Sequence, residues 1–229
     1  MRPLQRKVIK LSPVTKVLTI DGASGTGKTT VCLLLAERLN YRLLLSGLLY
    51  RMVAYFANEQ NAIDFISSLD ASALEMKSID GLPAFIYQGR NYYQELMQPK
   101  IAELASVIAV NPDVRSALLS LQHEFRIGLG LIAEGRDMGS VVFPDASLKV
   151  YLNASLAARA HRRAKQLQLA GKNISIDELL SKMSARDERD SSRLVSPMVC
   201  PDDAFIVDTS ELTIDEVVQK IVNKLHVVE

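Results

Sequence analysis

The sequence predicts an α/β fold in which a parallel β-sheet is flanked by helices. Two observations predict it. Short apolar runs alternate with longer stretches of helical pattern along the chain, and the first apolar run leads through a glycine-rich loop into a helix. A strand, a crossing helix and a second strand place the two strands parallel, because the helix returns the chain to the same end of the sheet.

The elements follow in order from the N-terminus. Each expected strand is a short apolar run of the length that a buried strand needs: Lys16–Ile20, Tyr41–Leu45, Leu129–Ala133, Leu148–Leu152 and Ala204–Val207. Helical stretches lie between or after these runs: Lys28–Leu39, Gly47–Asn58, Val114–Phe125, Ser155–Ala170, Ile176–Arg193 and Thr213–Leu225. One stretch, Ala73–Tyr93, breaks the alternation with short strands joined by turns at Asp80–Pro83 and Gln88–Asn91. We expect it to be a small antiparallel insertion.

Length and composition favour one domain over residues 1–229. The chain has 229 residues, of which 48% are hydrophobic and 23% charged, so it can bury a substantial core. The formal net charge is +1, which argues against bulk electrostatic binding to nucleic acid or to a membrane. Cys32 and Cys200 lack metal-ligand spacing, and we expect two reduced thiols in a cytoplasmic monomer. Residues 1–15 are basic, lack the apolar stretch of a signal peptide, and are expected to form an N-terminal extension.

The glycine-rich loop predicts a phosphate-binding site. Residues 22–29, GASGTGKT, match the pattern G-x-x-x-x-G-K-[ST] at every position, directly after a strand and at the start of a helix. The backbone N–H groups of such a loop point at phosphate, Lys28 would reach the β- and γ-phosphates, and the Thr29 hydroxyl would bind Mg²⁺. The alternative is a glycine-rich turn with a solvated lysine. The loop alone leaves a small-molecule kinase, a GTPase switch and a motor ATPase open.

Three further segments carry charge suited to a second anionic substrate. Ser46–Gly47 with Tyr50–Arg51 follows one strand end, and Glu134–Gly139 follows another, where open α/β sheets bind their ligands. Arginines at helical spacing also gather between Arg159 and Arg193, as in a lid that closes over substrates. The plain alternatives are a surface arginine, a tight turn with a local ion pair, and solvated helix faces.

Together these motifs resemble the bacterial cytidylate kinases. The resemblance is carried by residues 22–30, by Ser46–Gly47 with Tyr50–Arg51, by Glu134–Gly139 and the following residues 141–146 (VVFPDA), and by Arg186–Asp190 with Arg193. It extends from about Val17 to the C-terminus. It implies a P-loop kinase core, a monophosphate-binding insertion at about residues 65–99 and a helical lid at about residues 155–193. The implied reaction transfers the γ-phosphoryl group of ATP to CMP or dCMP, with Mg²⁺.

The resemblance also implies roles for individual residues. The implied ATP-binding residues are Gly22, Ala23, Ser24, Gly25, Thr26, Gly27, Lys28, Thr29, Thr30, Arg162 and Arg163. The implied CMP-binding residues are Ser46, Tyr50, Arg51, Ser106, Arg115, Arg136, Asp137, Arg186, Asp190 and Arg193. Within the latter set, Ser106, Arg115 and Asp137 would read cytosine, and Arg186 with Asp190 would hold the ribose. The implied catalytic residues are Lys28, Arg136, Arg163 and Arg193, and the implied metal-binding residue is Thr29.

Two departures from the family pattern bear on the acceptor site. Leu45 stands where the family commonly has Asp, and Leu96–Gln98 replaces an Ile-Arg-Thr run. We expect both to affect affinity and efficiency rather than the kind of reaction. The alternatives kept open are another small-molecule P-loop kinase, acting on UMP or AMP, and a nucleotide-binding protein with weakened catalysis. His123 and His161 are not expected to act as bases, because neither belongs to a motif.

Overall fold

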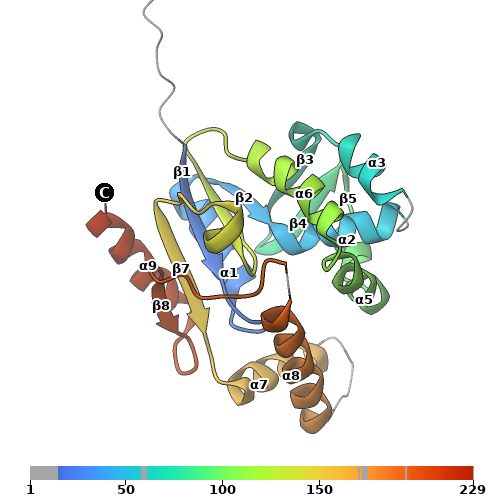
Figure 1. Cartoon of the computed structure of the whole chain (residues 1–229). Helices are drawn as coiled ribbons and strands as arrows, with labels where there is room; N and C mark the ends of the chain where they lie inside the picture. Colours follow the sequence, from blue (N-terminus) through green and yellow to red (C-terminus); the bar gives the residue numbers. More distant parts are fainter. Residues whose placement is uncertain (1–14, 58–60, 170, 172–174, 194, 229) are drawn as a thin grey trace, which may run out of the picture.

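The computed structural model describes residues 15–228 apart from 58–60, 170, 172–174 and 194 (Figure 1). Its centre is a five-stranded parallel sheet in the order β2-β6-β1-β7-β8. The strands are β1 (Lys16–Asp21), β2 (Arg42–Leu45), β6 (Gly130–Glu134), β7 (Leu148–Asn153) and β8 (Phe205–Asp208). All five predicted strands are present, and each differs from its predicted bounds by only one or two residues. The predicted α/β class is confirmed.

The main helices pack against this sheet and against one another. They are α1 (Lys28–Leu39), α2 (Ser46–Phe56), α6 (Pro112–Glu124) and α9 (Ile214–Val228). Helix α1 packs on β6 and on α9, and α9 also contacts β7. Helix α2 contacts β6 and α5 (Pro99–Ile108). Apolar residues of these elements form one continuous core with the strands, which fixes the ends of β1, β2 and β6 relative to one another.

A second, three-stranded antiparallel sheet confirms the predicted insertion. It has the order β3-β4-β5, from β3 (Leu74–Ile79), β4 (Leu82–Tyr87) and β5 (Arg90–Asn91). Both two-residue turns have two successive residues with positive φ, Asp80–Gly81 and Gln88–Gly89, as the twist of a tight hairpin requires. Helix α3 (Ala62–Ser67) and the short 3₁₀ turn η1 (Ala71–Ala73) precede β3, and helices α4 (Tyr93–Leu96) and α5 (Pro99–Ile108) follow β5. The sequence interpretation did not include these elements.

Helices α7 (Leu156–Leu169) and α8 (Ile176–Ser192) form a separate pair (Figure 1). Their contact buries a small apolar cluster of its own: Ala160, Ala164, Leu179 and Met183. This pair corresponds to the predicted lid, whose bounds at about 155–193 remain a prediction. Some parts of the predicted elements lie outside the described residues: residues 1–14 of the extension, Asn58, Ala170 at the end of the predicted helix Ser155–Ala170, and residues 172–174 of the predicted lid.

Two further observations concern the cysteines and the helices. Cys32 and Cys200 are both free thiols, as expected. Within the described part of the chain, a single helix of the length and apolarity needed to cross a bilayer is not found. Only α5 and α6 taken together reach that length and composition, and they are bent by 102° at the break between them.

Candidate functional site

The phosphate loop, residues 22–27, connects the C-terminal end of β1 to the first turn of α1. Gly22 has φ of +139°, and a Cβ atom there would lie 2.1 Å from the carbonyl oxygen of Leu152 on β7. Gly25, with φ of +85°, meets side chains from α7 and α8 in the same way at 3.2 Å. The loop is therefore held between the sheet and the helix pair, and glycine is required where the backbones approach most closely.

Lys28 is buried at the start of α1. Its Nζ atom donates a hydrogen bond to the carbonyl oxygen of Ala23 at 2.7 Å and lies 3.8 Å from Oε1 of Glu134. Burial, and secondly the neighbouring guanidinium of Arg136, lower the pKa of Lys28 from 10.5 to about 7. The positive charge of this buried ammonium group is poorly balanced by nearby negative charge, so an anion that enters the loop would stabilise it. Thr29 and Thr30 complete the first turn of α1, half-buried and exposed respectively.

Asp21 joins the phosphate loop to the segment after β6, and the sequence interpretation missed it. Its two carboxylate oxygens accept hydrogen bonds from the backbone N–H groups of Met138 and Gly139, at 2.9 and 2.8 Å. These residues begin η2 (Met138–Val142), a single π-helical turn. Burial raises the pKa of Asp21 from 3.8 to about 7, although both N–H groups lower it. An aspartate at a strand end, directly before the loop, was the available signal.

Arg136, which follows β6 and influences Lys28 electrostatically, meets residues at the C-terminal end of α8. The Nε atom of Arg136 donates to Oδ2 of Asp190 at 3.0 Å, and Arg186 lies 4.0 Å from the same oxygen. Arg193, just after α8, donates to the carbonyl oxygen of Asp190 at 3.3 Å. Its buried Nη2 atom has no hydrogen-bond partner among the described residues. The predicted phosphate-binding and ribose-binding residues of these two segments are thus brought together.

The three side chains of Tyr50, Arg115 and Asp137 form a second, deeper cluster. Arg115 and Asp137 make an ion pair in which the two side chains are only 8% and 6% exposed. The guanidinium of Arg115 also lies over the ring of Tyr50, 5.7 Å from its centre. Burial raises the pKa of Asp137 despite this guanidinium, and raises the pKa of Tyr50 to about 12. The pairing of Asp137 with Arg115, rather than with Arg136 or Arg193, was not predicted.

Two predicted site residues of α2 bind residues of the neighbouring helices α6 and α4. Ser46 Oγ accepts a hydrogen bond from Nε2 of the buried Gln122 on α6 at 2.8 Å. Arg51 donates to the carbonyl oxygen of Leu96 at 2.8 Å, which ties α2 to the end of α4. Ser106 is half-buried on α5, the helix that packs against α2. Gln122 was missed because a lone glutamine in a helix carries no pattern.

The two predicted lid arginines of α7 lie in different surroundings. Arg162 donates to the hydroxyl of Thr209 at 3.1 Å and to the carbonyl oxygens of Thr209 and Ser210, in the turn after β8. The Thr209 hydroxyl in turn donates to the carbonyl oxygen of Thr26 at 3.1 Å, so this turn borders the phosphate loop. Arg163 is exposed and donates to Gln166 at 3.3 Å. It lies close enough to Arg51 to contribute to the lowered pKa of that guanidinium.

Cations dominate the electrostatics of this region. Burial lowers the pKa of Arg186 to about 10, and Arg136 contributes next, as it does for Lys28. Burial also lowers the pKa of Arg51. The charge of Lys28, whose side chain is almost fully buried, is compensated poorly by solvent, which favours an anionic ligand.

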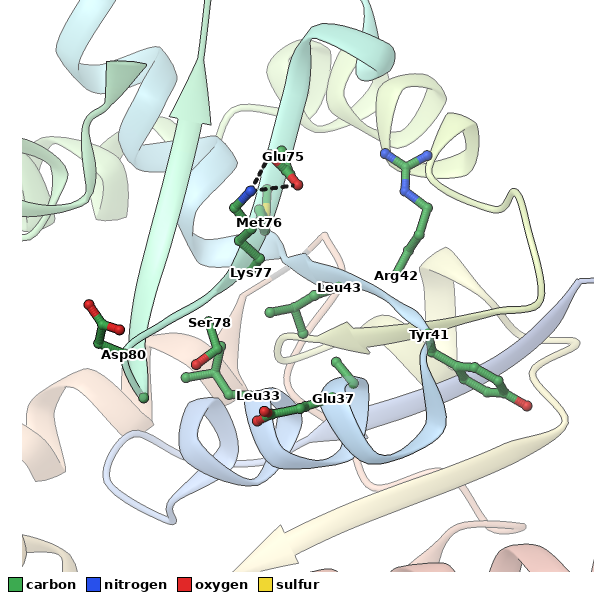
Figure 2. Close-up of a pocket in the computed structure, with 12 residues that line it drawn as sticks. Leu33, Glu37, Tyr41, Arg42, Leu43, Glu75, Met76, Lys77, Ser78 and Asp80 are labelled. Atoms are coloured by element: carbon green, nitrogen blue, oxygen red, sulfur yellow. Dashed lines mark hydrogen bonds and ion pairs between the residues drawn. The ribbon is translucent and has the colours of Figure 1, made fainter. Parts of the chain in front are cut away.

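A separate cavity of about 500 Å³ lies beside the C-terminal half of α1, between β2 and β3 (Figure 2). Acidic and basic groups alternate around it, including Glu37, Arg42 and Asp80, and an ion pair joins Glu75 to Lys77 at 2.9 Å. None of the predicted site residues lines it. With mixed charge and no such residue, this cavity is distinct from the anion site.

Comparisons with known proteins agree with the geometry. The family model described as cytidylate kinase matches residues 18–227. The chain is 42% identical to the cytidylate kinase of Vibrio cholerae over 218 residues, covering 92% of this chain and 96% of that protein. It is 40% identical to the cytidylate kinase of Serratia proteamaculans over 224 residues, covering 94% and 96%. The cytidylate kinase of Salmonella paratyphi B is 41% identical over 218 residues, covering 92% and 95%.

Proposed function

Since the chain belongs to the cytidylate kinase family, we propose that its phosphate loop binds ATP and that the crevice beside it binds CMP or dCMP. The activity is that of the family, a phosphotransferase reaction. The observation that carries the assignment of the two sites is the position of Arg136. It depresses the pKa of Lys28 on the donor side and pairs with Asp190 on the acceptor side. One guanidinium thus stands between two adjacent sites for anions.

On the donor side, residues 22–30 would hold the phosphates of ATP, with Lys28 at the β- and γ-phosphates. The charge of Lys28 is poorly compensated within the protein, which supports this role. Arg163, exposed on α7, would reach the transferring group when the lid closes. Arg162, bound to the turn after β8, would border ATP from the side of Thr209.

The residues present also fit Mg²⁺ bound together with ATP. A hydroxyl donor, Thr29, stands on the first turn of α1, and the carboxylate of Glu134 lies beside Lys28. Mg²⁺ usually keeps several waters and is held by one or two protein groups together with the phosphates of the substrate, which suits such a donor set. When bound, Mg²⁺ would neutralise charge on the β- and γ-phosphates.

On the acceptor side, each part of CMP has its own group of residues. Arg51, Arg136 and Arg193 would bind the phosphate with Ser46 and Tyr50 beside them. The buried Nη2 atom of Arg193 supports this, because it has no hydrogen-bond partner in the described part of the chain and needs an acceptor there. The ribose would be held by Arg186 and Asp190, and cytosine read by Ser106, Arg115 and Asp137.

In the reaction, an oxygen of the CMP phosphate attacks the γ-phosphorus of ATP in line with the leaving ADP oxygen. That oxygen is already anionic, so no general base is required. Lys28, Arg136, Arg163 and Arg193 position the reactants and stabilise charge on the transferring oxygens. His123 is not expected to act as a base in this reaction, because its Nε2 atom lies 2.7 Å from the carbonyl oxygen of Val142.

The two departures lie where they leave the reaction intact. Leu45 is buried, and its N–H group is 3.0 Å from the sulfur of Met76 on β3. It pairs in register with Glu134, which supplies a carboxylate one strand away. Met97 follows α4 and is 38% exposed. We further propose a cytoplasmic monomer with no nucleic-acid or membrane partner.

An ADP-release assay with an acceptor panel tests the proposal. CMP and dCMP are expected to be phosphorylated well, and UMP, AMP and shikimate poorly. A preference for UMP or AMP would assign the chain to another monophosphate specificity. Single-turnover transfer from labelled ATP distinguishes a slow kinase from a nucleotide-binding protein without turnover, which would transfer no label to any acceptor.

A further inference from the structure

Arg159, on α7, links three separate parts of the molecule and is only 6% exposed. Its Nε atom donates to the carbonyl oxygen of Ala154, after β7, at 3.2 Å. Its Nη1 atom donates to the carbonyl oxygen of Ser24 in the phosphate loop at 3.1 Å. Its Nη2 atom is 2.7 Å from Oδ2 of Asp187 on α8. The planar guanidinium holds all three in fixed relative positions.

The bond to Ser24 bears on the shape of the phosphate loop. In a trans peptide the C=O of one residue and the N–H of the next point in opposite directions. The carbonyl of Ser24 points at Arg159 on α7. The N–H group of Gly25, which belongs to the same peptide unit, therefore points away from the helix pair. Met183 and Arg159 also pack at 3.2 Å from the position of a Cβ atom on Gly25. Arg159 therefore helps to set the direction of a backbone donor in the loop.

Asp187 lies on α8 between the two residues assigned to the ribose, Arg186 and Asp190. One of its carboxylate oxygens binds Arg159, and the other is buried without a hydrogen-bond partner among the described residues. The Asp187 side chain as a whole is 21% exposed, but a buried carboxylate oxygen without a partner is unfavourable for stability alone. Asp187 lies on the helix assigned to the acceptor, and its partner Arg159 binds the phosphate loop assigned to the donor. This arrangement indicates a functional role for the pair.

We propose that Arg159 and Asp187 are a positioning pair that couples acceptor binding on α8 to donor binding at the phosphate loop. The proposal rests on the assignment of ATP to residues 22–29 and of the CMP ribose to Arg186 and Asp190. When CMP binds and orders α8, the carboxylate of Asp187 is held in place. Asp187 then holds the guanidinium of Arg159, which in turn holds the carbonyl group of Ser24 in the phosphate loop. By linkage, ATP raises the affinity for CMP by the same factor.

The test measures the affinity for a non-hydrolysable ATP analogue with Mg²⁺, without CMP and with saturating CMP. In the unchanged protein, CMP is expected to tighten analogue binding about fivefold or more. Asp187→Asn keeps the size of the side chain but removes its charge, and is expected to bring this ratio close to one. Glu178→Gln is the matched control, because Glu178 forms an exposed ion pair with Lys182 on the same helix. It should leave the ratio unchanged.

Two further measurements separate coupling from folding. Asp187→Glu restores the negative charge and is expected to recover part of the ratio of analogue affinities with and without CMP. In the double variant Asp187→Asn, Arg159→Lys, this ratio should be little lower than in Asp187→Asn alone. Thermal unfolding shows whether each variant is folded. Independent binding of the two ligands in the unchanged protein, or an unaltered ratio in folded Asp187→Asn, would overturn the proposal. Failure of the unchanged protein to bind CMP at all would contradict the proposed function instead.

Discussion

Replacing Asp137 by asparagine is expected to remove the preference for cytosine over uracil. Cytosine presents an exocyclic amine as a donor, where uracil presents a carbonyl oxygen and a protonated N3. A carboxylate beside that position accepts from cytosine and repels uracil. Asp137 is held in the crevice by its ion pair with Arg115, both side chains being almost fully buried. Asparagine keeps the shape and one oxygen for Arg115, and offers an N–H group to the base.

The size of the effect follows from the burial of the pair. A hydrogen bond to a charged acceptor contributes about 1.5–3 kcal/mol, which corresponds to about 10- to 150-fold in kcat/KM for CMP. The kcat/KM for UMP should stay unchanged or rise, so the ratio of kcat/KM for CMP to that for UMP should fall at least about tenfold. Asp137→Ala is a poorer probe, because an unpaired buried Arg115 would cost roughly 3–5 kcal/mol of stability by itself.

Steady-state kinetics with both acceptors decide the matter, together with thermal unfolding of each variant. Asp145→Asn is the control, since Asp145 forms an exposed ion pair with Arg126 outside the crevice. If Asp137→Asn lowered kcat/KM for CMP and UMP by the same factor, with a lower Tm, Asp137 would merely shape the turn after β6. The decisive quantity is therefore the ratio of kcat/KM for CMP to kcat/KM for UMP, and not the absolute rate with either acceptor.

Three other predictions concern the phosphate loop. Lys28→Met should lower turnover by roughly 100- to 1,000-fold, as measured by ADP release, and should leave CMP affinity by calorimetry unchanged. Because the pKa of Lys28 is lowered to about 7 and bound phosphates should raise it again, ATP binding at pH 8 should take up about 0.9 proton. Calorimetry in two buffers of different ionisation enthalpy measures this, and zero uptake would contradict the assigned role. Gly22→Ala should lower the free energy of unfolding by about 3 kcal/mol or more, because its Cβ would meet Leu152. Gly81→Ala, also at positive φ but with open space around it, should cost only about 1–2 kcal/mol in the same denaturant titration.

The parallel core could be predicted from the sequence because its strands are buried on both faces. Such strands read as largely apolar runs: β6 has only apolar residues and glycine before Glu134, and β1, with Val17, Leu18 and Ile20, is buried over all but its first residue. The helices around the insertion could not be predicted in the same way. Exposed apolar residues such as Leu104 and Val107 on α5 blur the periodicity that marks a helix. Short α4, with four residues, is below the length at which a pattern can be recognised.

The candidate site was predicted unevenly for a related reason. Contiguous motifs, such as the phosphate loop, were visible because their chemistry lies within a few residues. Contacts between distant segments were not, because partner choice depends on the fold. Arg115 and Asp137 are 22 residues apart, and Arg159 and Ser24 are 135 apart. The sequence contains each of these residues, but only packing decides which carboxylate meets which guanidinium.

The site is the part of the protein whose polar groups are least satisfied by the protein itself. With 27 basic and 26 acidic residues, the chain as a whole has nearly balanced charge, so the cations of the crevice reflect placement rather than composition. Five buried side-chain atoms lack a hydrogen-bond partner among the described residues, and three of them belong to Arg115, Asp187 and Arg193. Ordinary folding would pair such groups, because each costs stability. If nucleotide binds along α6, α8 and residue 193 as proposed, it would complete this network, and the substrates should stabilise the fold as they bind.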